Sequence, residues 1–137
     1  PLAQYDPVTW ARVFQVNLHS ALLLTQACWP LLRAAAPGAV VFTLAEQAYV
    51  AKANWGAYAV SKSALRTLFE TWAAESGVRA QVRVNAVVPH GVHTRLHMDA
   101  YPAATVEQLV PAALVAGAYV TLLGNAAHGQ VVHVPTD

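Results

Sequence analysis

Three short apolar runs and three longer segments with helical spacing alternate along the chain. The runs cover residues 39–44, 82–88 and 130–134. Short, nearly continuous apolar runs of this kind are typical of strands buried on both faces of a parallel sheet. Because a helical segment separates each run from the next, the pattern predicts right-handed crossover units and an α/β fold with a parallel sheet. No linker or repeat interrupts it, so we expect residues 1–137 to form a single domain.

The helical segments have recognisable ends. Apolar residues recur at helical spacing over residues 8–35, which predicts one long or bent helix there. Asn54 as N-cap and Gly77 just past the end predict a second helix over residues 55–76. A third helix is expected over residues 106–123.

Composition and charge narrow the class of protein. The 137 residues are 56% hydrophobic and 11% charged, which suits one globular domain with a real core. A net charge of +1 with eight scattered Lys and Arg residues offers no basic stripe, so we expect no nucleic-acid partner. The apolar segments are interrupted well before the roughly 18 residues that a membrane span needs, so we expect no membrane partner and a cytoplasmic location. The lone Cys28 cannot form an intramolecular disulfide and is expected to be a small core residue.

Tyr58 and Lys62 are the candidate chemical pair. A spacing of four in a helix places both side chains on one face, about 6 Å apart along the axis. A nearby ammonium and the positive end of the helix dipole would both lower the pKa of the phenol, which suits it for general acid–base catalysis. The alternative is that Lys62 only snorkels beside a core stripe formed by Tyr58, Leu65, Phe69 and Trp72.

The longer sequence Tyr-Ala-Val-Ser-Lys-Ser-Ala-Leu at residues 58–65 resembles the Y-x-x-x-K helix of the short-chain dehydrogenase/reductase family. Asn17 stands 41 residues earlier, where that family has its active-site Asn. Residues 82–89 resemble the strand that ends in the family's Pro-Gly motif, and residues 129–134 resemble its last strand. The resemblance covers nearly the whole chain but only the second half of a typical member. It implies the last three strands and their helices of a Rossmann-type, doubly wound sheet, most similar to bacterial oxidoreductases that are uncharacterised.

This resemblance implies hydride transfer between NAD or NADP and a carbonyl compound or secondary alcohol. Tyr58 would donate or accept the proton, and Lys62 would lower its pKa and bind the cofactor's ribose. Asn17 would help to hold a water in a proton relay to Lys62; the alternative is that it only bonds a neighbouring helical turn. The resemblance also implies a small-molecule substrate and a homodimer or homotetramer.

Residues 89–105 follow the second predicted strand, at the side of an open α/β sheet where ligands bind. The family's Pro-Gly-x-Val-x-Thr pattern is met by Pro89, Val92 and Thr94, with His90 in place of the Gly. The resemblance implies that the Val92 backbone and the Thr94 hydroxyl face the nicotinamide, and that a substrate lid follows. We expect Gly91 to take over the backbone conformation that the family's Gly provides.

Two departures from the family pattern favour a different hypothesis. Thirteen residues before Tyr58, where the family has a catalytic Ser, stands Ala45, and neither Thr43 nor Glu46 is well placed to replace the hydroxyl. The seven glycines do not form the glycine-rich sequence that binds the cofactor's pyrophosphate in this family. The choice between NAD and NADP therefore stays open. The alternative is therefore a catalytically impaired or truncated protein that serves as a packing or dimerisation module.

Three histidines, His90, His93 and His97, have a spacing that could converge on zinc in a helix. Pro89 and Gly91 disfavour a helix where the set begins, and no thiolate or carboxylate clearly completes it. We expect no metal site.

Overall fold

The computed structural model describes residues 1–77 and 81–135. In chain order, its longer elements are α1 (Pro7–Phe14), η2 (Gln15–His19), α2 (Ser20–Ala34), β1 (Gly38–Thr43), α3 (Gly56–Ser76), β2 (Val82–Pro89), α4 (Arg95–Ala100), α5 (Ala112–Gly124) and β3 (Val131–Val134). Short 3-10 helices lie at Leu2–Gln4, Glu46–Ala48 and Val106–Gln108. The strands form one parallel sheet in the order β1-β2-β3, which confirms the predicted α/β class.

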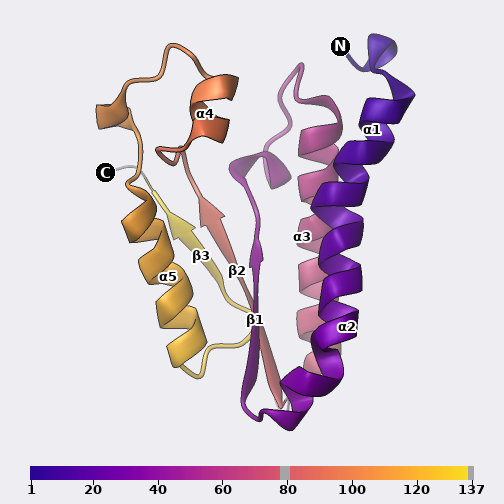
Figure 1. The fold of residues 1–137 in the computed structure, drawn as a ribbon, viewed down its shortest axis with the longest axis vertical. Coiled ribbons are helices and arrows are strands. Elements are labelled where there is room, and N and C mark those ends of the chain that lie inside the picture. The colour runs from indigo at the N-terminus through magenta and orange to yellow at the C-terminus, as the bar shows by residue number, and fades with distance from the viewer. Residues whose placement is uncertain (78–80, 136–137) are drawn as a thin grey trace.

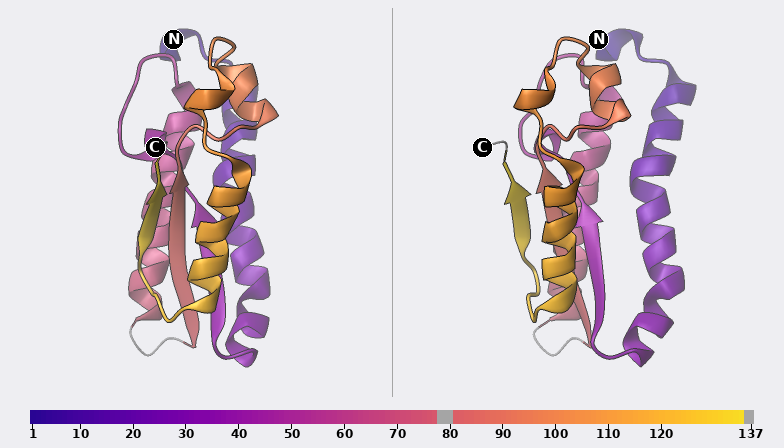
Figure 2. Two further views of the ribbon diagram at one scale, coloured as in Figure 1. Left: turned by 90° about the vertical axis from the view of Figure 1, so that its left-hand side faces the viewer. Right: turned by 60° about the vertical axis from the view of Figure 1, so that its left-hand side comes forward.

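The sheet lies between two layers of helices. Helices α2 and α3 cover one face and α5 covers the other, while α4 lies beyond the carboxyl ends of the strands (Figures 1 and 2). The central strand β2 contributes to both halves of the core: Val84 and Val88 pack with Phe69 of α3, whereas Val87 packs with Leu122 of α5. This burial on both faces explains why the sequence of β2 is almost continuously apolar.

The predicted first helix is present as one continuous helical path through α1, η2 and α2. Asp6 starts it, accepting hydrogen bonds from the backbone amides of Val8 at 3.3 Å and Thr9 at 2.8 Å. A π-helical turn, η2, interrupts the α-helical pattern between α1 and α2. Such turns insert one extra residue and often occur at functional sites, and this one carries Asn17.

The helix predicted over residues 55–76 is present as α3, but the predicted N-cap residue was wrong. Asn54 does not cap the helix, because its backbone has a φ of 68°, the left-handed conformation that Asn tolerates better than most residues. Trp55 occupies the N-cap position without a side-chain bond, and the helix begins at Gly56, whose φ is 45°. A Cβ on Gly56 would collide with the ring of Tyr5, so the close approach of that ring requires glycine. Gly77 ends the helix at a φ of 63°, as predicted.

The third predicted helix was wrong in its first turns. Residues 106–108 form a separate 3-10 turn, closed by a capping box between Thr105 and Gln108. α5 begins only at Ala112, immediately after Pro111, since proline is tolerated at the start of a helix and not inside it.

In the described residues, no helix is long and apolar enough to cross a membrane. Cys28 lies on α2 and is partly buried, and it belongs to neither cluster of core residues, in contrast to the expectation of a small core residue. Pro30 lies inside α2 and does not end it.

Candidate active site

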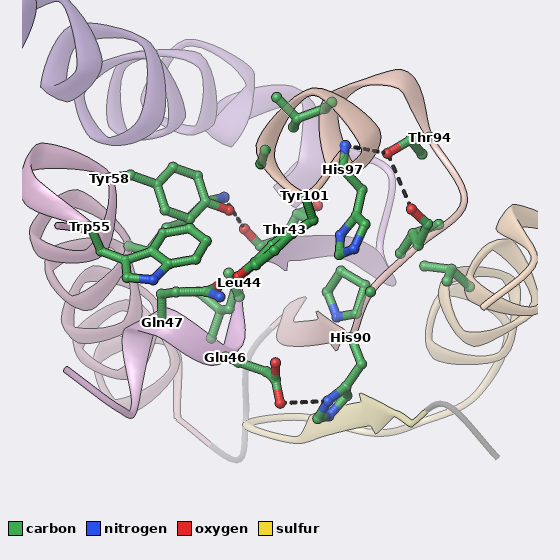
Figure 3. A pocket seen from close by; sticks show the side chains of 18 of the residues that line it. Thr43, Leu44, Glu46, Gln47, Trp55, Tyr58, His90, Thr94, His97 and Tyr101 are labelled. Carbon is green, nitrogen blue, oxygen red and sulfur yellow. Dashed lines mark hydrogen bonds and ion pairs between the residues drawn. The ribbon is translucent and has the colours of Figure 1, made fainter. Parts of the chain in front are cut away.

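A cavity of about 520 Å³ opens at the carboxyl ends of β1 and β2, between the first turns of α3 and the segment that contains α4 (Figure 3). It is lined by every residue that the resemblance placed at the cofactor, namely Tyr58, Lys62, Pro89, Gly91, Val92 and Thr94. Asn17 is not part of its lining. The structure thus brings most of the sequence-predicted residues to one cavity, on the side of the sheet where open α/β folds bind ligands.

Tyr58 and Lys62 both reach this cavity from α3, and they are not members of the fully buried core stripe. The helix is fixed beneath them by Ala57, Ser61 and Leu65, which are 0%, 0% and 4% exposed. Lys62 Nζ donates a hydrogen bond to the carbonyl oxygen of Thr43 at 2.9 Å and lies 6.0 Å from the centre of the Tyr58 ring. The ammonium is therefore held between the end of β1 and the phenol.

The expected direction of the Tyr58 pKa was wrong in this structure. Burial raises the pKa of Tyr58 above 10.0, and Tyr101 raises it further. Burial also lowers the pKa of Lys62 from 10.5, so the low-polarity site disfavours both charged forms. The ammonium and the helix dipole alone would lower the pKa of Tyr58, but the cost of removing the phenolate from water outweighs them. At neutral pH Tyr58 is a neutral phenol, the form that donates a proton.

Asn17 is joined to the same helix through Ser61. Its Nδ2 donates to Ser61 Oγ at 3.1 Å, and Ser61 Oγ in turn donates to the carbonyl oxygen of Tyr58 at 2.8 Å. The bond joins the π-helical turn to a neighbouring turn of α3, in agreement with the structural alternative for Asn17, and its role in a water relay stays a prediction. Asn17 is thereby placed beside the turn of α3 that carries Tyr58 and Lys62.

Ala45 lines the cavity at the end of β1 and is 6% exposed. Neither neighbour offers a free hydroxyl or carboxyl in its place. The Thr43 hydroxyl shares a 2.7 Å hydrogen bond with the hydroxyl of Tyr119, and Glu46 pairs with His90 Nδ1 at 2.7 Å. The carboxylate of Glu46 is directed at His90, as Figure 3 shows, and not at the phenol of Tyr58.

Gly91 does not replace the family's glycine in the way that was expected. Its φ is not among the positive values, so it does not supply an unusual dihedral angle. Its smallness is needed instead for packing, because a Cβ there would lie 3.0 Å from Cε1 of His97 and 3.1 Å from Leu109. Thr94 caps α4 by accepting a bond from the His97 amide at 3.2 Å, and its hydroxyl donates to the Val92 carbonyl at 3.3 Å.

The three histidines do not converge. His90 pairs with Glu46, the ring of His97 stacks on Tyr101 with centroids 4.8 Å apart, and His93 is exposed. Within residues 1–77 and 81–135, no group of three or more His, Cys, Asp or Glu side chains is arranged to hold a metal ion.

Sequence reasoning missed Trp55 and Tyr101 as residues of the cavity, and it considered His97 only as a metal ligand. Their spacing carries no periodic signal, because Trp55 precedes α3 while the other two lie in the connection after β2. It also missed Asn85, which is 0% exposed and ties β2 to the turn before β3 through Ala127 and Gln130. Its position as a polar residue inside an apolar strand could have identified it, because buried polar groups nearly always have a hydrogen-bond partner.

Comparison with known proteins relates this geometry to a family. The sequence profile of the family described as short chain dehydrogenase matches residues 1–105. The uncharacterized oxidoreductase YciK of Escherichia coli (strain K12) is 34% identical over 125 residues, which cover 91% of this chain and 49% of that protein. L-xylo-3-hexulose reductase of Hypocrea jecorina is 35% identical over 97 residues, covering 71% of this chain and 31% of that protein.

Solved structures show the same relation. A short chain dehydrogenase from Salmonella enterica serovar Typhi superposes with a TM-score of 0.90 at 32% identity, over 97% of this chain and 56% of its own. A short chain dehydrogenase from Escherichia coli CFT073 complexed with NADPH gives 0.89 at 33% identity, with the same coverage of 97% and 56%. The chain spans about half the length, or less, of the curated relatives that it matches.

Proposed function

The chain belongs to the short-chain dehydrogenase family, and from this we propose that the protein is an oxidoreductase that transfers a hydride between NAD or NADP and a carbonyl compound or secondary alcohol. The observation that carries the proposal is the convergence of Tyr58 and Lys62 on one cavity with Val92 and Thr94. The donor set fits a nicotinamide nucleotide, because a cation, a phenol and a hydroxyl line one cavity at the ligand-binding edge of the sheet. When bound, the nicotinamide would supply or accept the hydride.

The residues of the chain would handle the proton and the orientation of the reactants. Tyr58, neutral at pH 7, would donate its proton to the substrate oxygen during reduction and accept it back during oxidation. The Lys62 ammonium, fixed by the Thr43 carbonyl, would hold the ribose and stabilise the phenolate that each reduction leaves. Pro89, Gly91, Val92 and Thr94 would form the wall against the nicotinamide.

Asn17 would complete the route by which the phenol is reprotonated. Its bond to Ser61 holds it beside the α3 turn that carries Lys62, where its carbonyl oxygen could bind a water. Substitution of Asn17 should therefore slow turnover and leave cofactor binding intact.

Oxidation of NADPH or NADH, followed with a panel of ketones and aldehydes, tests the proposal. Tyr58→Phe should lower kcat by about a hundredfold or more, the usual contribution of a positioned acid. Tyr49→Phe is a matched control, since Tyr49 packs on Arg66 and does not line the cavity. Absence of turnover with every carbonyl and both cofactors, or an unchanged rate in Tyr58→Phe, would refute the assignment.

Ala45 favours a second candidate function, a catalytically impaired protein that serves as a packing module. The buried methyl group leaves the substrate oxygen with one donor fewer than the family pattern provides. Normal cofactor binding without turnover would support this candidate.

We also propose that the protein is a homodimer or homotetramer located in the cytoplasm. Large apolar side chains stand exposed along α1, η2 and α2, and a subunit contact would bury them: Val8, Val16, Leu23, Leu24 and Leu31. Light scattering should show at least a dimer at tens of micromolar, and Leu24→Glu should weaken it.

A further inference from the structure

Four ring side chains form an unbroken row along one wall of the cavity. The rings of Tyr58 and Trp55 have centroids 5.6 Å apart, Trp55 and Tyr101 lie 5.7 Å apart, and Tyr101 and His97 lie 4.8 Å apart. All four line the cavity. We call this row the ring wall. It begins at the phenol that would deliver the proton and runs across to α4.

Several polar side chains that line the cavity around the ring wall already have hydrogen-bond partners, whereas Gln47, which also lines it, has no side-chain bond within the described residues. The Thr43 hydroxyl is bonded to Tyr119, Glu46 is paired with His90, and the Lys62 ammonium is bonded to a backbone carbonyl. A sugar or other polyol needs many hydrogen-bond partners to compensate for its lost hydration, and the faces of aromatic rings supply none. A flat apolar ring makes no such demand.

From the ring wall we infer the substrate class: a ketone or aldehyde whose carbonyl is attached directly to an aromatic ring. This rests on the proposed function. The aromatic ring would lie against Trp55 and Tyr101, and the carbonyl oxygen would accept the proton of Tyr58. During reduction the carbonyl carbon gains a hydride from the reduced nicotinamide, the oxygen gains the phenolic proton, and the products are a benzylic alcohol and the oxidised cofactor.

The middle of the ring wall, at Trp55 and Tyr101, is separate from the residues assigned to the cofactor. Figure 3 shows Trp55 and Thr94 on opposite sides of the cavity. Thr94 and Val92 belong to the side assigned to the cofactor, so the ring wall near Trp55 is left for the substrate.

A comparison of two ketones with the same carbon skeleton tests the inference without any turnover. Acetophenone has an aromatic six-membered ring, and cyclohexyl methyl ketone has the saturated ring in its place. Removal of apolar surface from water would give the two ketones similar binding, or slightly favour the one with the saturated ring. Each contact between aromatic rings adds about 0.5–1.5 kcal/mol to the binding of acetophenone alone. With two such contacts, acetophenone should bind about tenfold more tightly in a chemical-shift titration by NMR.

Substitutions in the ring wall test whether it causes the preference for acetophenone. Trp55→Leu and Tyr101→Leu should each reduce the preference for acetophenone about threefold or more. Tyr49→Leu is the control, because Tyr49 is 39% exposed and Tyr101 is 37% exposed, yet Tyr49 lies outside the cavity. It should keep the full preference.

Several results would overturn the inference: no binding of acetophenone, equal binding of the two ketones, tighter binding of a ketohexose, or a preference that survives in both cavity variants. The two-ketone comparison in the unaltered protein does not depend on whether a variant folds. Turnover with aliphatic ketones alone would refute the aromatic substrate and leave the oxidoreductase proposal standing. Aromatic binding without any oxidation of NADPH or NADH would refute the oxidoreductase proposal and leave only a site that binds aromatic rings.

Discussion

Ala45→Ser is the most direct perturbation of the site, because it restores the one hydroxyl that the family pattern has and this chain lacks. The backbone of Ala45 is extended, with φ of −155° and ψ of 159°, which serine adopts without strain. It is also fixed on both sides: the amide of Leu44 donates to the Val87 carbonyl at 2.8 Å, and the Ala45 carbonyl accepts from Ala48 at 2.9 Å. A hydroxyl introduced here would therefore be held in one place.

The expected gain follows from what one positioned donor contributes. A single donor to a developing oxyanion is worth on the order of 3 kcal/mol, or about a hundredfold in kcat. The new group replaces one hydrogen atom at the cavity surface, so the free energy of unfolding should change by less than about 1 kcal/mol. We expect carbonyl reduction to rise about a hundredfold in Ala45→Ser, measured as NADPH oxidation under saturating cofactor.

Two controls make the measurement specific. Ala48→Ser adds the same hydroxyl at a site that is also 6% exposed but does not line the cavity, and it should leave the rate unchanged. Ala45→Ser combined with Tyr58→Phe should lose the gain, because the hydroxyl assists a proton donor and cannot replace it. If Ala45→Ser leaves the rate unchanged across ketones and aldehydes while the cofactor still binds, the reasoning from the missing hydroxyl is refuted and the packing-module function is favoured.

The remaining predictions concern packing and protonation. Gly91→Ala should displace the His97 ring by a few tenths of an ångström and weaken acetophenone binding in the NMR titration; unchanged shifts of His97 would contradict it. His128→Leu should lower the free energy of unfolding in urea by about 2 kcal/mol, because His128 bonds an amide of β2 and a carbonyl of α3, whereas the exposed His19→Leu should cost little. Since burial raises the pKa of Tyr58 above 10.0, alcohol oxidation, which needs the phenolate, should still be rising at pH 10, and a plateau by pH 8 would contradict this.

The fold could be predicted from the sequence because the apolar runs are long enough to identify strands buried on two faces. The strands predicted over residues 39–44, 82–88 and 130–134 are within one residue of β1, β2 and β3 at each end. The parallel arrangement followed from the helices between them. Register could not be predicted, since it depends on pairs such as Gly38 with Val82 that are far apart in the sequence.

The predictions that failed were based on neighbouring residues in the sequence, at positions where packing between distant segments decides the structure. Asn54 is a common N-cap residue, but the turn before α3 puts it in a left-handed conformation, and the next residues admit the ring of Tyr5. The pKa of Tyr58 was judged from its neighbour four residues away, whereas its burial depends on elements as distant as α4. Proximity along a helix is visible in a sequence, and desolvation is not.

Ala45 and the ring wall act on different kinetic quantities, which makes their contributions separable. Contacts between the ring wall and an aromatic substrate are the same in the ground state and the transition state, so they lower KM and leave kcat unchanged. A donor at position 45 would bond mainly the negative oxygen that develops during the reaction, so it would raise kcat. Trp55→Leu should then raise KM at constant kcat, and Ala45→Ser should raise kcat at nearly constant KM. On the proposed function, the cavity would supply the binding of the substrate, while one part of the transition-state stabilisation would be missing. The double variant should show the two effects as independent factors, because the two residues contact different parts of the substrate.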